Sequence, residues 1–502
     1  MDLDLTTGGW MLLGLSLAMA FAFEMVNGCH DTANAVATVI YTNSLKPMTA
    51  VVWAGIWNFI GVLYAMATGL AVAFSIVHLL PVDLVVSLGQ TAGILMVLSM
   101  LASAIFWNAG TWYLGIPASS SHTLIGAILG AGLGGALLRG QPWAEGVNWG
   151  KVSSTFQALL VSPLIGFAGA ALLLLVCKAF ARDPRLYQPP VGKEPPPPWI
   201  RRVLILTCTG VSFAHGSNDG QKGIGLIMLI LVGMLPGAYA LNPSFGAEDI
   251  RNVTAVVDRA RGFFQAEQQK PRVMTGQLGA GVAPLRDGGP EAEWADVHAA
   301  GTPVTPDARS ILAHLALVRG LVADRSSFKE IKPQERFKVR TEILRLRQAM
   351  RDYAKLHQPE LSADERKTLA GMTPSVYRIT EFAPIWVSIG VAFALGIGTM
   401  IGWRRIVVTV AEKIGKTHLT YAQGMSAEIM AMATVFGADL IGLPVSTTHV
   451  LSSGIAGTMA ANRSGLQGKT LRNIALAWVL TLPVTMALSA LLFIGLSAVF
   501  LR

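Results

Sequence analysis

Residues 213–226, "FAHGSNDGQKGIGL", place an aspartate and a lysine in a run that is otherwise rich in apolar residues and glycine. The two charged residues are Asp219 and Lys222, and Asn218 directly precedes the aspartate. Ionisable side chains are costly in such a segment and usually mark a functional site. A carboxylate among exposed backbone carbonyls suits a hard cation or a proton carrier.

Two runs of hydroxyl residues indicate a different chemistry. The runs are "PASSSHT" and "PVSTTH". Hydroxyls and free backbone N–H groups at a helix N-terminus can bind an oxyanion, whereas plain N-capping is the alternative. His122 and His449 end these runs, and they are either ordinary core residues or groups that orient the loops or carry protons.

The charged stretch occurs twice. "NGCHDTANAVATVI", residues 27–40, aligns with "HGSNDGQKGIGLIM", residues 215–228, so that Asp31 matches Asp219. Because small residues surround both aspartates, we expect the helices to unwind there and expose backbone groups. Glu24 lies seven residues before Asp31, about two helical turns, and could share its face.

The hydroxyl run is also duplicated, since "GIPASSSHTLIGAILG" (115–130) aligns with "GLPVSTTHVLSSGIAG" (442–457). The interval from aspartate to histidine is 91 residues in the first copy and 230 in the second. The excess of 139 is close to the 138 residues of a polar segment, 241–378. Two homologous halves, the second with an insert, are typical of a secondary transporter whose site lies between the halves.

The elements that carry these residues are predicted to be membrane helices. The chain has 502 residues, of which 52% are hydrophobic and only 14% charged, against about a quarter charged in soluble domains. Runs long enough to cross a bilayer are 9–26, 48–75, 84–108, 152–177, 203–240, 380–402 and 471–500. The run 203–240 has room to cross once, or twice as two short segments.

The net charge of +9 does not indicate nucleic-acid binding, because Lys and Arg cluster in loops, as membrane topology requires. The loops at 178–202 and 404–416 are therefore expected on the cytoplasmic side. Arg404, Arg405, Lys413 and Lys416 resemble a set of side chains that reach the membrane interface. No nucleotide-binding or catalytic motif is present, so the chain is not expected to be an enzyme.

The predicted organisation has five parts. A first membrane repeat over 1–180 is followed by a basic, Pro-rich linker over 181–202. The second repeat begins at 203–240, is interrupted by the polar insert 241–378, and continues over 379–502. Within the insert, roughly 305–370 has apolar residues at helical spacing and predicts a soluble helical hairpin. The sequence does not specify a partner for it.

"NGCHDTANAVATVIYTNSLKP", "HGSNDGQKGIGLIMLILVG" and the paired "SSSHT" and "STTHV" runs resemble the Pit family of inorganic phosphate transporters, closest to its bacterial low-affinity branch. The resemblance implies an all-α polytopic protein with two inverted repeats, broken helices and re-entrant hairpins, assembled as a homodimer. It implies symport of protons with phosphate, as a complex with a divalent metal such as magnesium, across the bacterial inner membrane. No covalently bound cofactor is expected.

The resemblance also assigns residues. Asp31 and Asn34 fall on the family's first ion-binding signature and Asp219, beside Asn218, on the second, with Glu24 as a further coupling candidate. The hydroxyls implied for phosphate are those of Ser119, Ser120, Ser121, Thr123, Ser446, Thr447 and Thr448. His122 and His449 are supporting candidates.

Two departures concern the coupling ion. Sodium-coupled relatives have asparagine at the position of Lys222, and the animal branch has glutamate at a position that resembles Asn58 here. We hypothesise that Lys222 is a tethered cation, paired with Asp219, that replaces sodium and attracts phosphate; the alternative is that it reaches water. A sodium-coupled carrier of phosphate or another oxyanion, and a non-transporting receptor that acts through the insert, are the competing functions.

Overall fold

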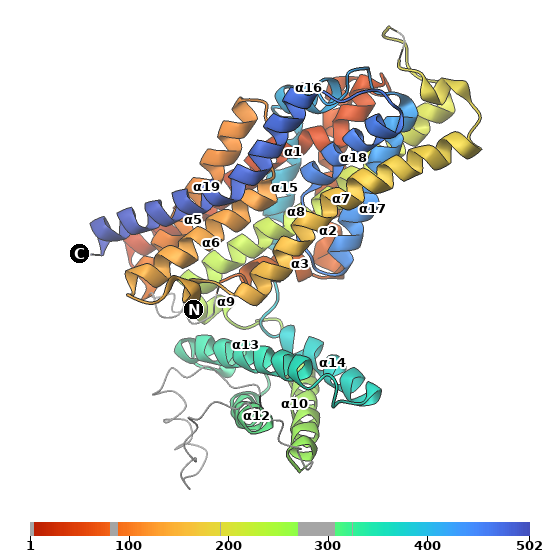
Figure 1. The fold of residues 1–502 in the computed structure, drawn as a ribbon. Coiled ribbons are helices and arrows are strands. Elements are labelled where there is room, and N and C mark those ends of the chain that lie inside the picture. Colours follow the sequence, from red (N-terminus) through yellow and green to blue (C-terminus); the bar gives the residue numbers. More distant parts are fainter. Residues whose placement is uncertain (1–4, 81–88, 191, 270–306, 324, 502) are drawn as a thin grey trace. The chain divides into compact units, whose positions relative to one another are not determined.

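The computed structural model describes residues 5–80, 89–190, 192–269, 307–323 and 325–501 (Figure 1). The chain divides into two compact units. One unit comprises Leu235–Phe382, and the other comprises Asp4–Met234 with Ala383–Arg502. The larger unit carries all the candidate site residues and is called the membrane unit below.

The membrane unit is built from helices of two consecutive chain segments. Its described residues contain no strand apart from one isolated bridge between Gly415 and Leu466. The first segment forms α1 (Thr7–Tyr41), α2 (Pro47–Thr68), α3 (Ala71–Val77), α5 (Gly89–Tyr113), α6 (Ser120–Leu138) and α7 (Trp149–Phe180). The second forms α8 (Pro198–Met234), α15 (Ile385–Met400), α16 (Arg404–Glu412), α17 (Tyr421–Leu440), α18 (Thr447–Ala461) and α19 (Gly468–Phe500).

Six of the described helices are long and apolar enough to cross a membrane, namely α1, α2, α5, α6, α7 and α19. A seventh candidate is α15 together with α16, which are bent by 70° at their junction. The predicted all-helical, multi-pass character is therefore confirmed. The run 203–240 is the exception, because the polar residues of α8 keep that helix out of this set.

Helix α8 runs without a break from Pro198 to Met234, so the alternative of two short segments is wrong. It also begins inside the range 181–202 that was predicted as linker. Pro198 explains the earlier start, since proline is well suited to the first turn of a helix.

The expected unwinding around the two aspartates does not occur. Asp31 lies within α1 and Asp219 within α8, and both helices are continuous there. The nearby glycines allow close packing instead. A Cβ atom on Gly28 would overlap the carbonyl oxygen of Leu395 on α15, and one on Gly216 would overlap that of Asn58 on α2. Glycine is used here because two helix backbones touch.

The packing of one segment recurs in the other. Helix α1 packs on α15 as α8 packs on α2, and α6 packs on α19 as α18 packs on α7. In the α6–α19 and α18–α7 pairs the helix backbones again approach closely at equivalent glycines. Gly130 lies against Met486, and Gly457 lies against Phe167. Each segment also has a helical hairpin, α5–α6 or α17–α18. Each of these contacts between the two segments thus has a counterpart in which the roles of the segments are interchanged.

The smaller unit contains α9 (Pro236–Tyr239), α10 (Ala247–Gln269), α12 (Ala308–Val322), α13 (Pro333–Leu356) and α14 (Ala363–Tyr377). The predicted hairpin over 305–370 is therefore too simple, since three of these helices overlap that range. They share an apolar core with α10 that includes Val257, Phe264, Ile311, Val318 and Ile343. The polar surface of α10 concealed its apolar stripe in the sequence.

Candidate functional site

The two hydroxyl runs form the tips of the helical hairpins and are built alike. Gly115 and Gly442 both have a φ of +67°, which glycine adopts readily, and so end α5 and α17 in the same turn. Ser119 then caps α6 and Ser446 caps α18, each accepting a hydrogen bond of 3.2 Å from the histidine N–H three residues later. One hydroxyl of each run is therefore used in capping, whereas the next two point elsewhere.

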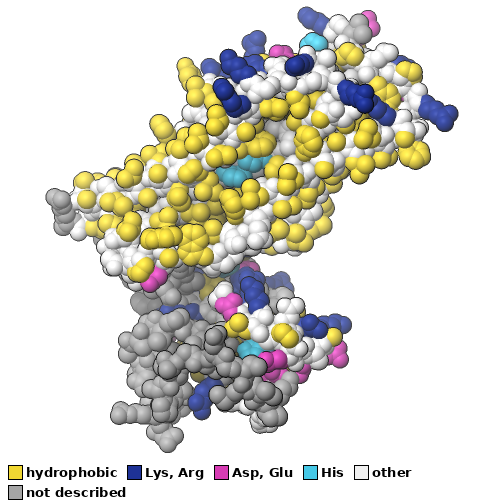
Figure 2. All heavy atoms as spheres, in the orientation of Figure 1, with side chains coloured by type: hydrophobic (Ala, Val, Ile, Leu, Met, Phe, Trp, Pro, Cys, Tyr) yellow, Lys and Arg dark blue, Asp and Glu magenta, His cyan; other side chains and the backbone are white. Residues whose placement is uncertain are grey.

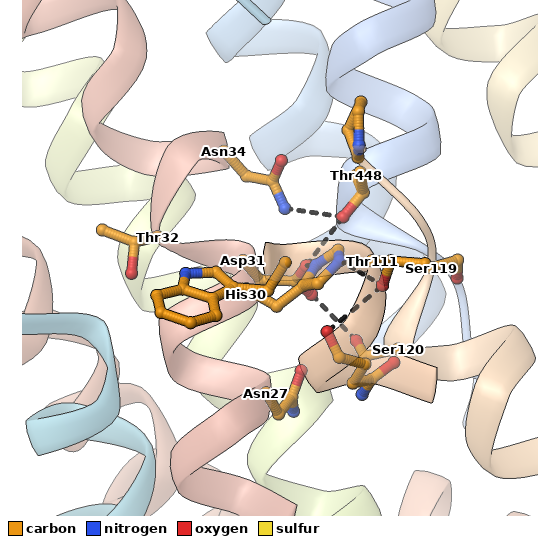
Figure 3. A network of polar contacts seen from close by, with 12 residues as sticks. Asn27, His30, Asp31, Thr32, Asn34, Thr111, Ser119, Ser120 and Thr448 are labelled. Carbon is orange, nitrogen blue, oxygen red and sulfur yellow. Dashed lines mark hydrogen bonds and ion pairs between the residues drawn. The ribbon is translucent and has the colours of Figure 1, made fainter. Parts of the chain in front are cut away.

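Asp31 lies at the centre of a buried polar network that joins both tips (Figure 3). Its carboxylate accepts hydrogen bonds from Ser120 of α6 at 2.9 Å and from Thr448 of α18 at 2.8 Å. The Nδ1 atom of His30 lies 3.0 Å from the same carboxylate. Asn34 donates to the Thr448 hydroxyl at 2.9 Å. A single carboxylate thus holds the tips of both hairpins.

Lys222 is almost completely buried, with 1% of its surface exposed, so the alternative that it reaches water is wrong. Its ammonium lies 2.6 Å from Asp219 Oδ1, donates to Ser121 Oγ at 2.6 Å and to the Val445 carbonyl at 3.1 Å. Ser121 passes a hydrogen bond of 2.8 Å to the same carbonyl. Three acceptors, one of them charged, make a buried ammonium tolerable.

The two networks are related by the sequence repeat. Asn34 and Lys222 are equivalent positions, and so are Thr448 and Ser121. Asn34 of the first half bonds Thr448 of the second half, while Lys222 of the second half bonds Ser121 of the first. Each half therefore completes the site of the other. The chemical difference between them is that an amide in one is an ammonium in the other.

Three buried side chains form a donor set that suits a cation. One ligand atom each from Asp31, His215 and Asp219 lies within 4.8 Å of the others. The Nε2 atom of His215 is 3.6 Å from an oxygen of each aspartate. Within the described part of the chain, neither that nitrogen nor Asp219 Oδ2 has a hydrogen-bond partner. Two carboxylates and an imidazole are ligands that divalent cations accept.

Other predicted residues occupy the margin of the site. Asn218 donates to the Leu443 carbonyl at 3.2 Å, near the second tip. Thr123 donates to the Ser119 carbonyl of its own helix at 3.0 Å, so its hydroxyl is engaged locally. Thr447 Oγ1 is buried and has no hydrogen-bond partner among the described residues. The geometry gives Thr447 a free hydroxyl but directs Thr123 to the backbone.

Glu24 is buried on α1, seven residues before Asp31, and no hydrogen bond joins the two carboxyl groups. Its carboxyl accepts a weak bond of 3.4 Å from Asn27 and packs against Gly223 of α8. Its Oε1 atom has no hydrogen-bond partner in the described structure. Glu24 of α1 thus packs against Gly223, the residue that follows Lys222 on α8, and lies beside the site.

The two histidines of the tips face each other. The ring centroids of His122 and His449 are 4.5 Å apart, and His449 stacks on Trp478 of α19 at 4.0 Å. His122 Nδ1 lies 2.8 Å from the capping hydroxyl of Ser119. The pair therefore fixes the two tips against each other.

Two histidines that contact the aspartates were not among the predicted site residues, His30 and His215. His215 had a readable signal, because "HGSND" places it four residues before Asp219 and so on the same helix face. His30 is adjacent to Asp31 and is held from the other side by Thr111 of α5, at 3.2 Å. That partner is 81 residues away and could not be inferred.

The fold and site define a multi-pass helical membrane protein with two facing, hydroxyl-tipped hairpins. The same fold is present in a solved structure described as a sodium-dependent phosphate transporter. That match has a TM-score of 0.52 at 18% identity and covers 98% of this chain and 100% of the other.

Comparison of the sequence identifies the family. Residues 27–489 match the model of the phosphate transporter family. The chain is 43% identical to the low-affinity inorganic phosphate transporter PitA of Escherichia coli K12, over 98% of this chain and 97% of that one. It is 42% identical to PitB of the same organism, with the same coverage. A probable low-affinity inorganic phosphate transporter of Bacillus subtilis is 27% identical over 97% of both chains.

This chain therefore belongs to the phosphate transporter family, a family of transporters and not of enzymes.

Proposed function

We propose that this chain is a secondary active symporter that imports inorganic phosphate across the bacterial inner membrane. The observation that carries the proposal is the convergence of two hydroxyl-bearing helix N-termini on one buried site. Ser120 and Thr448 both bond Asp31, and Ser121 bonds Lys222. Hydroxyls and N–H groups at the starts of α6 and α18 are suitable donors to phosphate oxygens. The names of the bacterial relatives given above support the same substrate.

The phosphate is proposed to travel with a divalent metal ion. A doubly charged cation would neutralise hydrogen phosphate, which lowers the cost of moving the anion through a low-dielectric site. Asp31, His215 and Asp219 would receive the cation, since their ligand atoms lie within 4.8 Å of one another. The metal is cargo in this scheme, and an imidazole among the ligands also admits transition metals.

Protons are proposed as the coupling ion, with Lys222 as a tethered cation in place of sodium. The support is its contact with Asp219 at 2.6 Å, at the position equivalent to Asn34. A proton-coupled carrier also needs a side chain that gains and loses a proton. Lys222 is the first candidate for that role. Glu24 is the second, because its Oε1 atom lies beside the site without a hydrogen-bond partner among the described residues.

We further propose that the two halves are inverted repeats and that α5–α6 and α17–α18 are re-entrant hairpins. The matching helix contacts and the exchanged bonds of Asn34 and Lys222 support this arrangement. The homodimer rests on the family resemblance. The basic residues of 178–202 and 404–416, which the structure places partly in helices α7, α8 and α16, favour a cytoplasmic location for their end of the membrane unit.

The test is phosphate uptake into proteoliposomes that contain the purified full-length protein. A pH gradient or a sodium gradient is imposed, each with and without magnesium. We expect uptake that follows the pH gradient, depends on the metal, and is inhibited by arsenate but not by sulfate. Uptake driven by sodium alone would contradict proton coupling, and inhibition by sulfate would favour a less selective oxyanion carrier.

Lys222→Asn tests the role of the lysine directly. We expect the variant to lose uptake driven by the pH gradient and to gain a response to sodium, because a neutral amide leaves Asp219 free for a cation. The matched control is Lys193→Asn, which alters an exposed lysine of the linker. Unchanged proton-driven uptake without a sodium response would show that Lys222 does not replace the ion.

A further inference from the structure

A polar cavity lies apart from the proposed phosphate site, between the end of α5 and the bend that joins α15 to α16. Its volume is about 610 Å³, within the range of roughly 300–1,000 Å³ that small-molecule sites occupy. Its walls include Trp112 and Tyr113 on one side and Arg404, Arg405 and Lys413 on the other. All of these residues belong to the membrane unit.

The cavity wall carries three cationic side chains and no acidic one. Arg405 is held in place, since it donates to the Tyr113 carbonyl at 2.7 Å and its guanidinium lies 4.6 Å from the Tyr113 ring centroid. Arg404 and Lys413 are exposed and make no ion pair or hydrogen bond with any described side chain. The neighbouring Glu412 is not part of the cavity wall, and both it and Arg404 interact electrostatically with Tyr41 of α1. The cavity therefore favours an anion.

The surroundings of the cavity are those of a membrane interface. Lys and Arg gather at the end of the membrane unit that carries α16, directly beside an apolar surface (Figure 2). Leu114 and Ile401, at the ends of the two facing segments, are 69% and 49% exposed. Tryptophan and tyrosine are enriched where a protein meets lipid headgroups, and basic pockets between membrane helices bind anionic headgroups on the cytoplasmic side.

We propose that this cavity binds the phosphate group of an anionic phospholipid, with Arg404 and Lys413 as its charged ligands. The guanidinium of Arg404 can offer two parallel N–H donors to phosphate oxygens, and Lys413 adds a second positive charge. Free inorganic phosphate has the same group, but it has no apolar part that would contact the apolar and aromatic rim. The acyl chains of a phospholipid would lie along that rim.

The bound headgroup would support the first hairpin tip. Thr409 of α16 donates to the Gly115 carbonyl at 2.8 Å, and Trp112 Nε1 donates to the Gly402 carbonyl at 2.9 Å. The α15–α16 bend is thereby joined to the residue that begins the tip. Ser119 lies only four positions further along the chain. An anionic lipid that fixes α16 therefore stabilises the segment from which Ser120 and Ser121 project.

The experiment compares the full-length protein with Arg404→Gln/Lys413→Gln in lipid nanodiscs. One set of discs contains phosphatidylcholine alone, and the other contains phosphatidylcholine and phosphatidylglycerol in equal parts. Thermal unfolding and the phosphatidylglycerol retained after transfer to detergent are measured. The side chains of Arg404 and Lys413 are both exposed, so the two substitutions leave the core intact. The matched control is Lys193→Gln.

We expect phosphatidylglycerol to raise the unfolding temperature of the wild type and of the control, but not that of the double variant. Loss of two interfacial cations should weaken lipid retention about 30-fold. Equal stabilisation and equal retention in the wild type and the double variant would overturn the proposal. Inorganic phosphate is titrated in the discs of phosphatidylcholine alone, and a stabilisation that the double variant loses would assign the cavity to the free anion instead. The readouts do not depend on uptake, so they remain valid if phosphate transport is disproved.

Discussion

Replacing Lys222 by methionine should destabilise the protein strongly, because the substitution leaves a buried carboxylate without its partner. Asp219 Oδ1 would lose the ammonium at 2.6 Å, and its Oδ2 atom already lacks a hydrogen-bond partner among the described residues. His215 Nε2, at 3.6 Å, is too distant for a good hydrogen bond. Removing one member of a buried ion pair costs about 3–5 kcal/mol. We therefore expect a loss of that size.

The double substitution Asp219→Asn/Lys222→Met removes both charges and separates the ion pair from other effects of the mutations. Ser121 keeps its hydrogen bond to the Val445 carbonyl at 2.8 Å, so this contact between the two hairpin tips does not depend on the lysine. The double variant should be more stable than Lys222→Met alone, with a coupling of about 2 kcal/mol or more between the two sites.

The assay is thermal unfolding of the purified protein in detergent, with the wild type, both single variants and the double variant measured together. Lys193→Met, an exposed lysine in the linker, controls for the loss of one positive charge. Two results would refute the reasoning. Lys222→Met could unfold at the wild-type temperature, or the double variant could be destabilised by the full sum of the single effects.

Three further predictions test other parts of the structure. Gly216→Ala should lower the unfolding temperature, whereas Gly233→Ala in the same helix should not, because a Cβ overlaps the Asn58 carbonyl at the first position and meets no atom within 4 Å at the second. Ser120→Ala should raise the phosphate concentration for half-maximal uptake about tenfold, since it removes one of the hydroxyl donors proposed for the phosphate oxygens; a normal uptake curve would exclude that role. Arg340→Met should make full-length protein more sensitive to limited proteolysis within the insert than Lys355→Met does. Arg340 is 5% exposed, and its guanidinium donates to the carbonyls of Ala240 and Thr380, where the chain enters and leaves the insert.

The repeated sequence predicts several residues that the structure brings into one buried polar network. Asp31 and Asp219 were found because ionisable residues in apolar runs are rare and these two occupy equivalent positions. The hydroxyl runs were found because both follow a glycine and a proline in the same order. Such signals depend on residue type and spacing along the chain, which a sequence contains in full.

The sequence could not show which side chains bond each other. Asn34 and Thr448 are separated by 414 positions, and Lys222 and Ser121 by 101. Which pair meets depends on how α1 and α8 pack against the two hairpins. Gly28 and Gly216 were misleading for a related reason, since a glycine that allows unwinding and one that allows close packing look the same in a sequence.

The insert shows the same limit at a larger scale. Apolar periodicity located helices within 305–370, but it did not divide the range, although Pro333 at the start of α13 and the capping box of Ser362 and Glu365 at the start of α14 mark the boundaries. Helix α10 was missed because acidic and basic residues surround its narrow apolar stripe, which is buried only by the helices that pack against it.

The exchange of bonds between the halves has a consequence for the history of the molecule. A polypeptide that corresponded to one half alone would have its aspartate and its hydroxyl run, but it would lack the bonds that Asn34 and Lys222 make to hydroxyls of the other half. Two copies would have to associate to close a single site. The present chain holds two such copies in one polypeptide, so one copy can carry Lys222 while the other carries Asn34 at the equivalent position. An assembly of identical subunits could not have made that distinction.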